Sequence, residues 1–175
     1  MNTLKKRKEE VKWFAVYTRP KTEKKVEERL SAAGFDTFLP LQTVEKKWSD
    51  RKKRMKVPLI NSYVFVKSTC KNLGQIYSIP GVINILKYLG NYAVVKDSEI
   101  ENLRILSTNS HFKTTIRSIP VHVVKGAKVT VAEGPFKGLY GVYQDKAGKN
   151  KVIIVMETLG SCVEVTLPLK CLQTV

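Results

Sequence analysis

The sequence predicts an α+β domain built on a mainly antiparallel sheet, followed by a small all-β barrel. Residues 13–95 alternate short apolar strands with helical segments, whereas the last fifty residues hold only short β-rich runs between glycine turns. A polar, proline-ended stretch separates the two textures. We therefore divide the chain into a disordered basic N-terminus at 1–10, a first domain at 11–106, a linker at 107–121 and a second domain at 122–175.

The first domain opens with WFAVY, residues 13–17, which has the composition of a buried strand. A helix is expected over 20–34, with Pro20 in its first turn and Gly34 ending it. Val26, Leu30 and Ala33 supply its apolar face. The remaining expected elements are strands at 35–44, 62–67, 81–89 and 92–95, a protruding basic hairpin at 45–57 and a short helix at 71–79.

A last helix is expected at 97–106, before the linker. Asp97 or Ser98 would cap it, and Ser98 and Glu101 have the spacing of a capping box. Ile100, Leu103 and Leu106 or Ser107 would form its buried stripe.

Composition argues against several classes of protein. The cysteines, Cys70, Cys162 and Cys171, are odd in number and lack CxxC spacing, so we expect reduced thiols. With only His111 and His122 besides, we expect no metal site. We find no nucleophile with a base beside a glycine-rich turn, so we expect neither an enzyme nor a cofactor. Without an apolar run of ~18 residues or a signal-peptide h-region, we expect a cytoplasmic monomer that does not contact membranes.

The charge indicates a polyanionic partner. The chain carries a net charge of +16, and residues 1–60 hold 17 Lys and Arg against 8 Asp and Glu, a net of +9. Residues 122–175 hold 7 against 4, a net of only +3. Because lysine and arginine attract phosphates and an aromatic ring can stack on a base, we expect nucleic-acid contact at the basic hairpin. Its candidates are Lys46, Lys47, Trp48, Arg51, Lys52, Lys53, Arg54 and Lys56. A solubilising hairpin is the alternative.

The segment SYVFVK, residues 62–67, alternates Tyr63 and Phe65 on one face with Val64 and Val66 on the other. In a sheet covered on one side, only one of these sets is core. The aromatic set, joined by Tyr17, could therefore be core or a partly open face that binds a protein.

The order of motifs along the chain resembles the NusG family. The resemblance rests on WFAVYTRPKTEKKVEERL, PLINSYVFVK, IPGVINILKYLG and DSEIENL in the first domain. In the second domain, VTVAEGPFKGLYGV with Gly141 is similar to the glycine-containing signature of KOW domains. The resemblance covers residues 12–175 and implies an RNP-like sandwich followed by an SH3-like KOW barrel.

The resemblance implies a transcription elongation factor that binds bacterial RNA polymerase at the clamp of its largest subunit. Carried over by position, the polymerase-binding face falls on Tyr17, Ile60, Tyr63, Phe65 and Tyr88. The basic hairpin, with Arg19, Lys24 and Lys25, would then lie near upstream or non-template DNA. The KOW domain would contact Rho or a small-subunit ribosomal protein through Phe136, Leu159 and Gly160, the last two in the loop 158–161.

The subtype implied is a specialised one. Leu159 and Ser161 stand where general factors have an aromatic residue and an arginine, and the PLINSYVFVK segment resembles the UpxY-type antiterminators of capsular polysaccharide operons. Residues 151–167 are rich in Val, Ile and Thr, which favours strands, so we expect a KOW barrel without helical autoinhibition. The alternatives are a general factor that assists Rho termination and a ribosome- or RNA-binding KOW protein. An unrelated DNA-binding regulator would need a basic recognition helix, which the sequence lacks.

Overall fold

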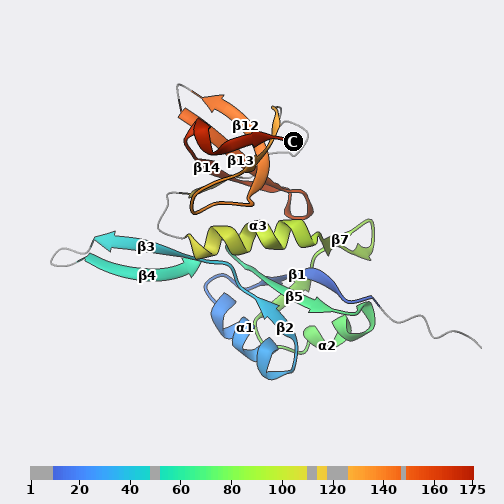
Figure 1. Ribbon diagram of the computed structural model, residues 1–175. Helices are drawn as coiled ribbons and strands as arrows, with labels where there is room; N and C mark the ends of the chain where they lie inside the picture. Colours follow the sequence, from blue (N-terminus) through green and yellow to red (C-terminus); the bar gives the residue numbers. More distant parts are fainter. Residues whose placement is uncertain (1–9, 48–51, 110–113, 118–125, 147–148) are drawn as a thin grey trace, which may run out of the picture. The chain divides into compact units, whose positions relative to one another are not determined.

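The computed structural model describes residues 10–47, 52–109, 114–117, 126–146 and 149–175. The chain forms two compact units, one of Met1–Leu39 with Ser62–Val95 and one of Pro40–Asn61 with Lys96–Val175. The boundaries of these two units differ from those of the predicted domains at 11–106 and 122–175. The predicted domain division therefore stays a prediction. Figure 1 labels many of the elements of both units.

The first unit is built on a five-stranded antiparallel sheet of order β2-β5-β1-β6, with β9 also pairing β1. Its strands are β1 (Lys12–Thr18), β2 (Asp36–Phe38), β5 (Tyr63–Ser68), β6 (Val82–Ile85) and β9 (Val94–Val95). A small hairpin joins β7 (Lys87–Tyr88) to β8 (Asn91–Tyr92). The helices are α1 (Glu23–Ala32), η1 (Cys70–Asn72) and α2 (Leu73–Ile76), and Figure 1 shows α1 and α2 on the same side of the sheet.

The predicted helix 20–34 is shorter than expected. Lys21 adopts a positive φ of 63°, so Pro20 precedes the helix instead of lying in its first turn. At the other end Gly34 does terminate α1, with φ +87°. The N–H of Gly34 donates to the carbonyl of Ser31 and that of Phe35 to Leu30, a pattern that glycine's left-handed conformation permits.

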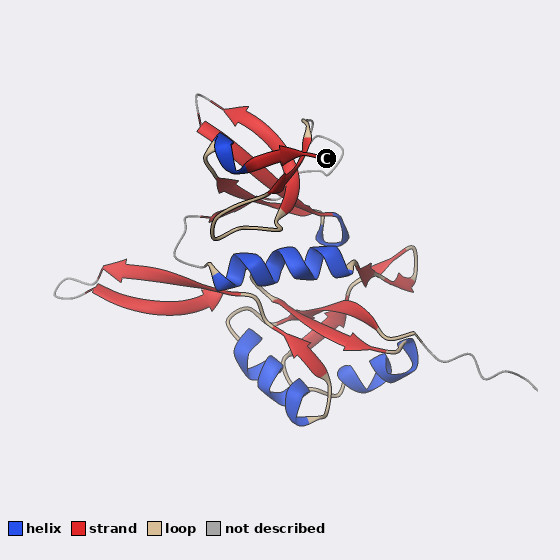
Figure 2. Ribbon diagram, viewed as in Figure 1, coloured by secondary structure: helices blue, strands red, loops and turns tan. Residues whose placement is uncertain are grey.

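The second unit contains a six-stranded antiparallel sheet of order β10-β14-β13-β12-β11-β15. Its strands are β10 (Thr114–Arg117), β11 (Lys128–Val131), β12 (Tyr140–Lys146), β13 (Lys149–Met156), β14 (Ser161–Thr166) and β15 (Leu172–Thr174), with short turns η3 (Glu157–Leu159) and η4 (Leu169–Cys171). Figure 2 shows this part of the chain as strands, as residues 151–167 predicted. The unit also holds α3 (Asp97–Thr108) and the hairpin of β3 (Leu41–Lys47) and β4 (Lys52–Pro58).

Two sequence-based expectations fail in this unit. Residues 114–117 form strand β10 within the predicted linker, because the β-branched TTIR segment pairs with the edge of β14. The other error is the cap of α3: Lys96 is the N-cap, without a side-chain cap hydrogen bond, so neither Asp97 nor Ser98 caps the helix. The predicted stripe of Ile100, Leu103 and Leu106 is buried.

The predicted N-terminal segment 1–10 lies, except for Glu10, outside the described residues, as do His111 and His122. Within the described part of the chain, no helix has both the length and the apolar character to cross a bilayer.

Candidate interaction surfaces

An aromatic pair lies at the surface of the first unit. Tyr17 of β1 and Tyr63 of β5 are directly opposite in the antiparallel register, and their ring centroids are 5.4 Å apart at an interplanar angle of 54°. Tyr17 is 37% exposed, although Ala15 and Val16 just before it are buried. Burial, and then the neighbouring Tyr17, raise the pKa of the Tyr63 hydroxyl above its ordinary value. The Tyr63 ring therefore stays neutral, and beside Tyr17 it offers aromatic surface to an apolar partner.

A hollow lies beside this aromatic pair. It is lined by Tyr17, Tyr63, Asn84, Leu86 and Lys87, and its volume is about 270 Å³. The three strand segments meet there because β6 pairs with β1, with Asn84 opposite Tyr17. Sequence reasoning missed Asn84, Leu86 and Lys87, since nothing in their spacing places them beside Tyr17. The hollow thus combines aromatic and aliphatic side chains with polar ones, as protein-binding patches commonly do.

A buried carboxylate fixes the turn that precedes Tyr63. Glu23, at the start of α1, is 5% exposed, and its Oε1 accepts the backbone N–H of Ser62 at 2.8 Å. Ser62 has φ 63°, and its carbonyl accepts the N–H of Thr18 at 2.9 Å. Glu23 therefore holds a strained turn against β1 and positions Tyr63. The sequence did not predict this role of Glu23, because its neighbours along the chain are exposed lysines.

The other predicted members of the polymerase-binding face differ in accessibility. Phe65 is fully buried and packs against Phe38, with ring centroids 6.3 Å apart. Ile60 is also buried, and it belongs to the second unit. Tyr88, at the turn between β7 and β8, is 73% exposed, and Leu89 beside it is 84% exposed. A partner could thus touch Tyr17, Tyr63 and Tyr88 directly, but the expectation that Phe65 and Ile60 lie at the surface is wrong for the chain in this state.

The basic hairpin of the second unit has two unlike faces. Lys52, Arg54 and Lys56 alternate along β4, so they share one face at intervals of about 6.6–6.8 Å, and all three are exposed. The opposite face carries the half-buried pair Val44 and Met55. Arg54 Nε donates to Oε1 of Glu45, its cross-strand neighbour, at 3.0 Å. One face is therefore suited to contact phosphates.

The remaining predicted basic residues are distributed over both units. Arg19, Lys24 and Lys25 are exposed in the first unit, and Lys53 is exposed in β4. Lys46 and Lys47 lie in β3, where their backbones pair with Lys53 and Lys52. Trp48 and Arg51 lie outside the described residues. The register thus brings four of the predicted lysines together in one hairpin.

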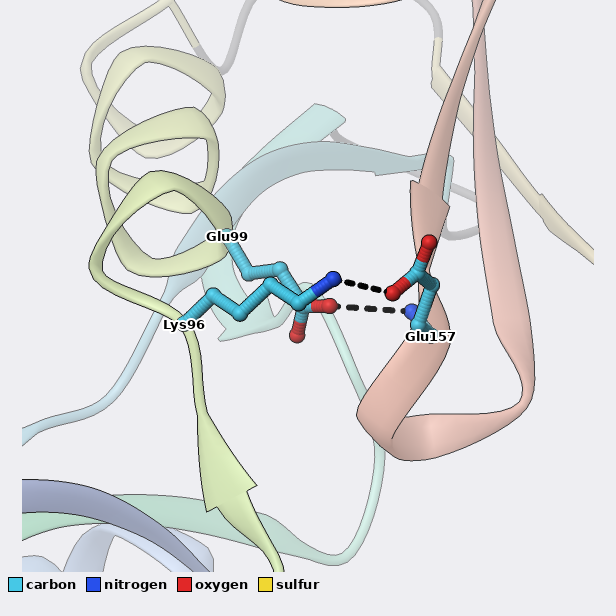
Figure 3. A network of polar contacts seen from close by, with 3 residues as sticks. All are labelled: Lys96, Glu99 and Glu157. Atoms are coloured by element: carbon cyan, nitrogen blue, oxygen red, sulfur yellow. Dashed lines mark hydrogen bonds and ion pairs between the residues drawn. The ribbon is translucent and has the colours of Figure 1, made fainter.

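A polar network joins α3 to the C-terminal sheet inside the second unit (Figure 3). Oε1 of Glu99, whose side chain is almost fully buried, accepts the N–H of Glu157 at 3.0 Å. The ammonium of Lys96 pairs with the carboxylate of Glu157. Burial raises the pKa of Glu99, although hydrogen bonds from Thr158 and Glu157 oppose the rise. Sequence reasoning missed this network, because Glu99 looked like an ordinary residue of a first helical turn.

The comparison with known proteins assigns the family. Residues 11–104, more than half of the chain, match the model of the NusG family, described as transcription termination factor nusG. The chain belongs to the NusG family. Members of the NusG family are non-enzymatic transcription factors, so this chain is a transcription factor and not an enzyme.

One solved structure of similar fold is a NusG. The structure describing domain interaction in Thermotoga maritima NusG is 22% identical to this chain, with a TM-score of 0.55, and the match covers 95% of this chain and 98% of that one. The structure of an MjSpt4:Spt5 complex in its conformation B is also 22% identical, with a TM-score of 0.32 and coverage of 93% and 96%. The first likeness supports a mixed α/β fold with antiparallel sheets.

The C-terminal contact residues expected for a NusG-family protein are not equally accessible. Phe136, in the turn 134–138, is 1% exposed, so its ring is not accessible in this structure, and its contact with a partner stays a prediction. Leu159 is half-buried, and Gly160 is exposed with a left-handed φ of +58°. The turn at Leu159 and Gly160 is the accessible part of that predicted surface.

Proposed function

We propose that this NusG-family chain is a transcription elongation factor that binds bacterial RNA polymerase and promotes antitermination. The observation that carries the proposal is the pair of exposed Tyr17 and half-buried Tyr63 beside a hollow in the first unit. Aromatic residues that are held rigidly at a surface are frequent hot spots of protein interfaces. The clamp of the largest polymerase subunit is the partner, with Tyr88 as a further contact.

The mechanism is differential binding and needs no catalytic group. A factor that binds the elongating polymerase more tightly than the paused polymerase shifts the population toward elongation. A coupling of about 1–3 kcal/mol changes such an equilibrium roughly 5- to 150-fold. Tyr17 and Tyr63 provide the apolar anchor, and Glu23 positions Tyr63 through the Ser62 turn.

The basic hairpin contacts nucleic acid in the same complex. Lys52, Arg54 and Lys56 face one side of β4, where they attract phosphates of upstream or non-template DNA without reading sequence. Arg19, Lys24 and Lys25 of the first unit add to this attraction. The C-terminal sheet acts as a KOW domain whose turn at Leu159 and Gly160 recruits Rho or a ribosomal protein of the small subunit.

The specialised role is that of an UpxY-type antiterminator on a capsular polysaccharide operon. Its support is the sequence resemblance together with Leu159 and Ser161. A second candidate is a general factor that assists Rho, which the family's description as a termination factor favours. The two differ in the sign of their effect on transcription through a terminator.

The test is transcription through a terminator by purified bacterial RNA polymerase, with and without the protein and Rho. We expect more read-through with the protein and co-elution with polymerase. Tyr17→Ala combined with Tyr63→Ala is expected to weaken polymerase binding by on the order of 30-fold or more, as for loss of interface hot spots. Tyr140→Ala is a matched control, because Tyr140 is 40% exposed but lies in the other unit.

The outcomes of this experiment distinguish the two candidate functions and test the aromatic contact. Reduced read-through only when Rho is present would favour the general factor. If the double variant is folded and binds polymerase as tightly as the wild type, the aromatic pair is not the contact. If the wild-type protein neither co-elutes with polymerase nor changes read-through, the elongation role is wrong and retention on ribosomes becomes the next measurement.

A further inference from the structure

The two-residue turn at the tip of the β7–β8 hairpin carries an unusual side chain. Leu89 has a φ of 48° and Gly90 one of +82°, and positive φ at both central residues is typical of a type I′ hairpin turn. Glycine, asparagine and aspartate adopt this left-handed conformation at little cost, whereas the Cβ of leucine is crowded against its own backbone there. Leu89 therefore occupies its position at a conformational cost.

The side chain of Leu89 is also poorly placed in water. It is 84% exposed, more than any other large hydrophobic residue that the structure describes. A Cβ added at the neighbouring Gly90 would meet no atom within 4 Å, so the space beside the turn is open. An exposed leucine alone, or a positive φ alone, is ordinary in proteins. Both disadvantages at one residue indicate that the leucine contacts another molecule.

The hairpin below this turn is held in place by the core of the first unit. The ring of Tyr92 meets the buried ring of Phe14 edge-on, with centroids 6.4 Å apart. On the facing strand, the ammonium of Lys87 lies 5.0 Å from the centroid of the Tyr92 ring. At the base, the N–H of Ala93 donates to the carbonyl of Leu86 at 2.9 Å. The turn is therefore presented on a supported hairpin.

The hairpin continues the surface that we propose for polymerase binding. Leu86 and Lys87 line the hollow beside the aromatic pair of Tyr17 and Tyr63. Leu89 follows Lys87 after two residues, a distance of at most about 7 Å along the chain. A partner that covers the hollow can therefore also reach the tip of the hairpin.

We propose that Leu89 is an apolar anchor for RNA polymerase, and that the strained turn presents it to a recess on the clamp. The inference rests on the proposed function, because it names the same partner. It adds a contact to the aromatic pair and gives the unfavourable turn a role. Burial of a leucine side chain in a complex strengthens binding roughly tenfold or more.

The test measures two properties of the full-length protein: its denaturation midpoint alone, and its affinity for purified polymerase without nucleic acid. Leu89→Asn supplies a residue that favours the left-handed conformation and removes the apolar side chain. We expect a higher denaturation midpoint together with roughly tenfold weaker binding. If Leu89 only supported the hairpin, its replacement would lower the midpoint and weaken binding through that loss, which would overturn the inference.

Two control variants separate the turn from the side chain. Lys21→Asn relieves a positive φ of 63° at another exposed residue of the first unit, so it should raise the midpoint without weakening polymerase binding. Leu89→Met keeps an apolar side chain of similar volume, so it should bind polymerase nearly as tightly as the wild type.

The remaining outcomes distinguish this inference from the proposed function. If Leu89→Asn binds as tightly as the wild type while Tyr17→Ala with Tyr63→Ala loses binding, Leu89 is not an anchor and the proposed function stands. Equal weakening by Leu89→Asn and Leu89→Met would also overturn the anchor role, because apolar contact would not be the cause. If the wild-type protein does not bind polymerase, the proposed function fails and the anchor role fails with it.

Discussion

The carboxylate of Glu23 is the residue-scale link between the core of the first unit and its proposed binding surface. It accepts the N–H of Ser62, whose positive φ places Tyr63 at the start of β5. The N–H of Ser62 is buried with this bond, so no water can replace a lost acceptor without opening the turn. A single side chain thereby determines the position of the half-buried Tyr63 ring.

We predict that Glu23→Ala lowers the free energy of unfolding by about 1–3 kcal/mol, since it leaves the Ser62 N–H without its acceptor. Denaturant unfolding measures this loss, and the same protein should bind polymerase more weakly because Tyr63 is no longer held. Glu23→Gln is the control, as its amide oxygen can still accept the bond. Full stability in the alanine variant would show that the turn does not depend on Glu23.

The sequence was most informative about single residues whose environment is local. Gly34 ends α1 as its position after Ala33 predicted, because the helix C-terminus needs a left-handed residue at that point. Periodicity left the burial of Phe65 open, because alternation identifies opposite faces of a strand but not which face the fold covers. The burial of Phe136 was missed, because this residue lies in a turn, where no such pattern applies. The hydrogen bonds between the side chain of Asn102 and the backbone of Tyr140 were missed because the two residues are 38 positions apart in the chain.

At the scale of elements, the hydrophobic pattern located the main strands correctly. It was less successful for the segments between them, at 35–44 and in the predicted linker. Segments 13–17 and 62–67 form the neighbouring strands β1 and β5, because both are short apolar runs that are buried along most of their length. The segment 35–44 instead divides between β2 and β3, which belong to different units. The sequence predicted a linker at strand β10 because this segment is polar. Its threonines also favour strands, but the strand forms only where β14 provides a pairing edge.

The contact between β12 and β13 depends on a glycine. A Cβ added at Gly141 would lie 2.7 Å from the carbonyl oxygen of Ile153 and 2.8 Å from Cγ1 of Val152. Neither atom can move away cheaply, since one is backbone and the other belongs to a fully buried side chain. The glycine that marks the sequence resemblance in this segment therefore has a packing role.

We predict that Gly141→Ala destabilises the protein by about 1–3 kcal/mol through overpacking of the two strands. Thermal or denaturant unfolding measures this change. Gly74→Ala is the matched control, because Gly74 lies in α2 with nothing within 4 Å of the added methyl group. It should leave stability unchanged or raise it by up to about 1 kcal/mol, since alanine favours helix. Equal effects of the two substitutions would disprove the packing argument.

At the scale of the whole molecule, charge and apolar surface have different salt dependence. The net charge of +16 attracts any nucleic acid, and each phosphate contact contributes about −0.9 to the slope of log K against log salt on duplex DNA. The aromatic pair of the first unit involves no charge, so screening by salt should weaken its proposed contact with polymerase only slightly. Salt can therefore separate the two kinds of binding in one protein.

We predict that Lys52→Gln combined with Lys56→Gln reduces the salt slope of duplex DNA binding by roughly two, as expected for the loss of two phosphate contacts. Fluorescence anisotropy of labelled duplex DNA, titrated at salt concentrations between about 50 and 200 mM, measures this slope. The Debye length is about 10 Å near the middle of that range. Lys137→Gln with Lys170→Gln is the control, because it removes the same charge from exposed turns outside the hairpin. The hairpin variant should still bind polymerase, since Tyr17 and Tyr63 are unchanged. An equal loss of slope in both variants would mean that net charge alone, and not the face of β4, binds the nucleic acid.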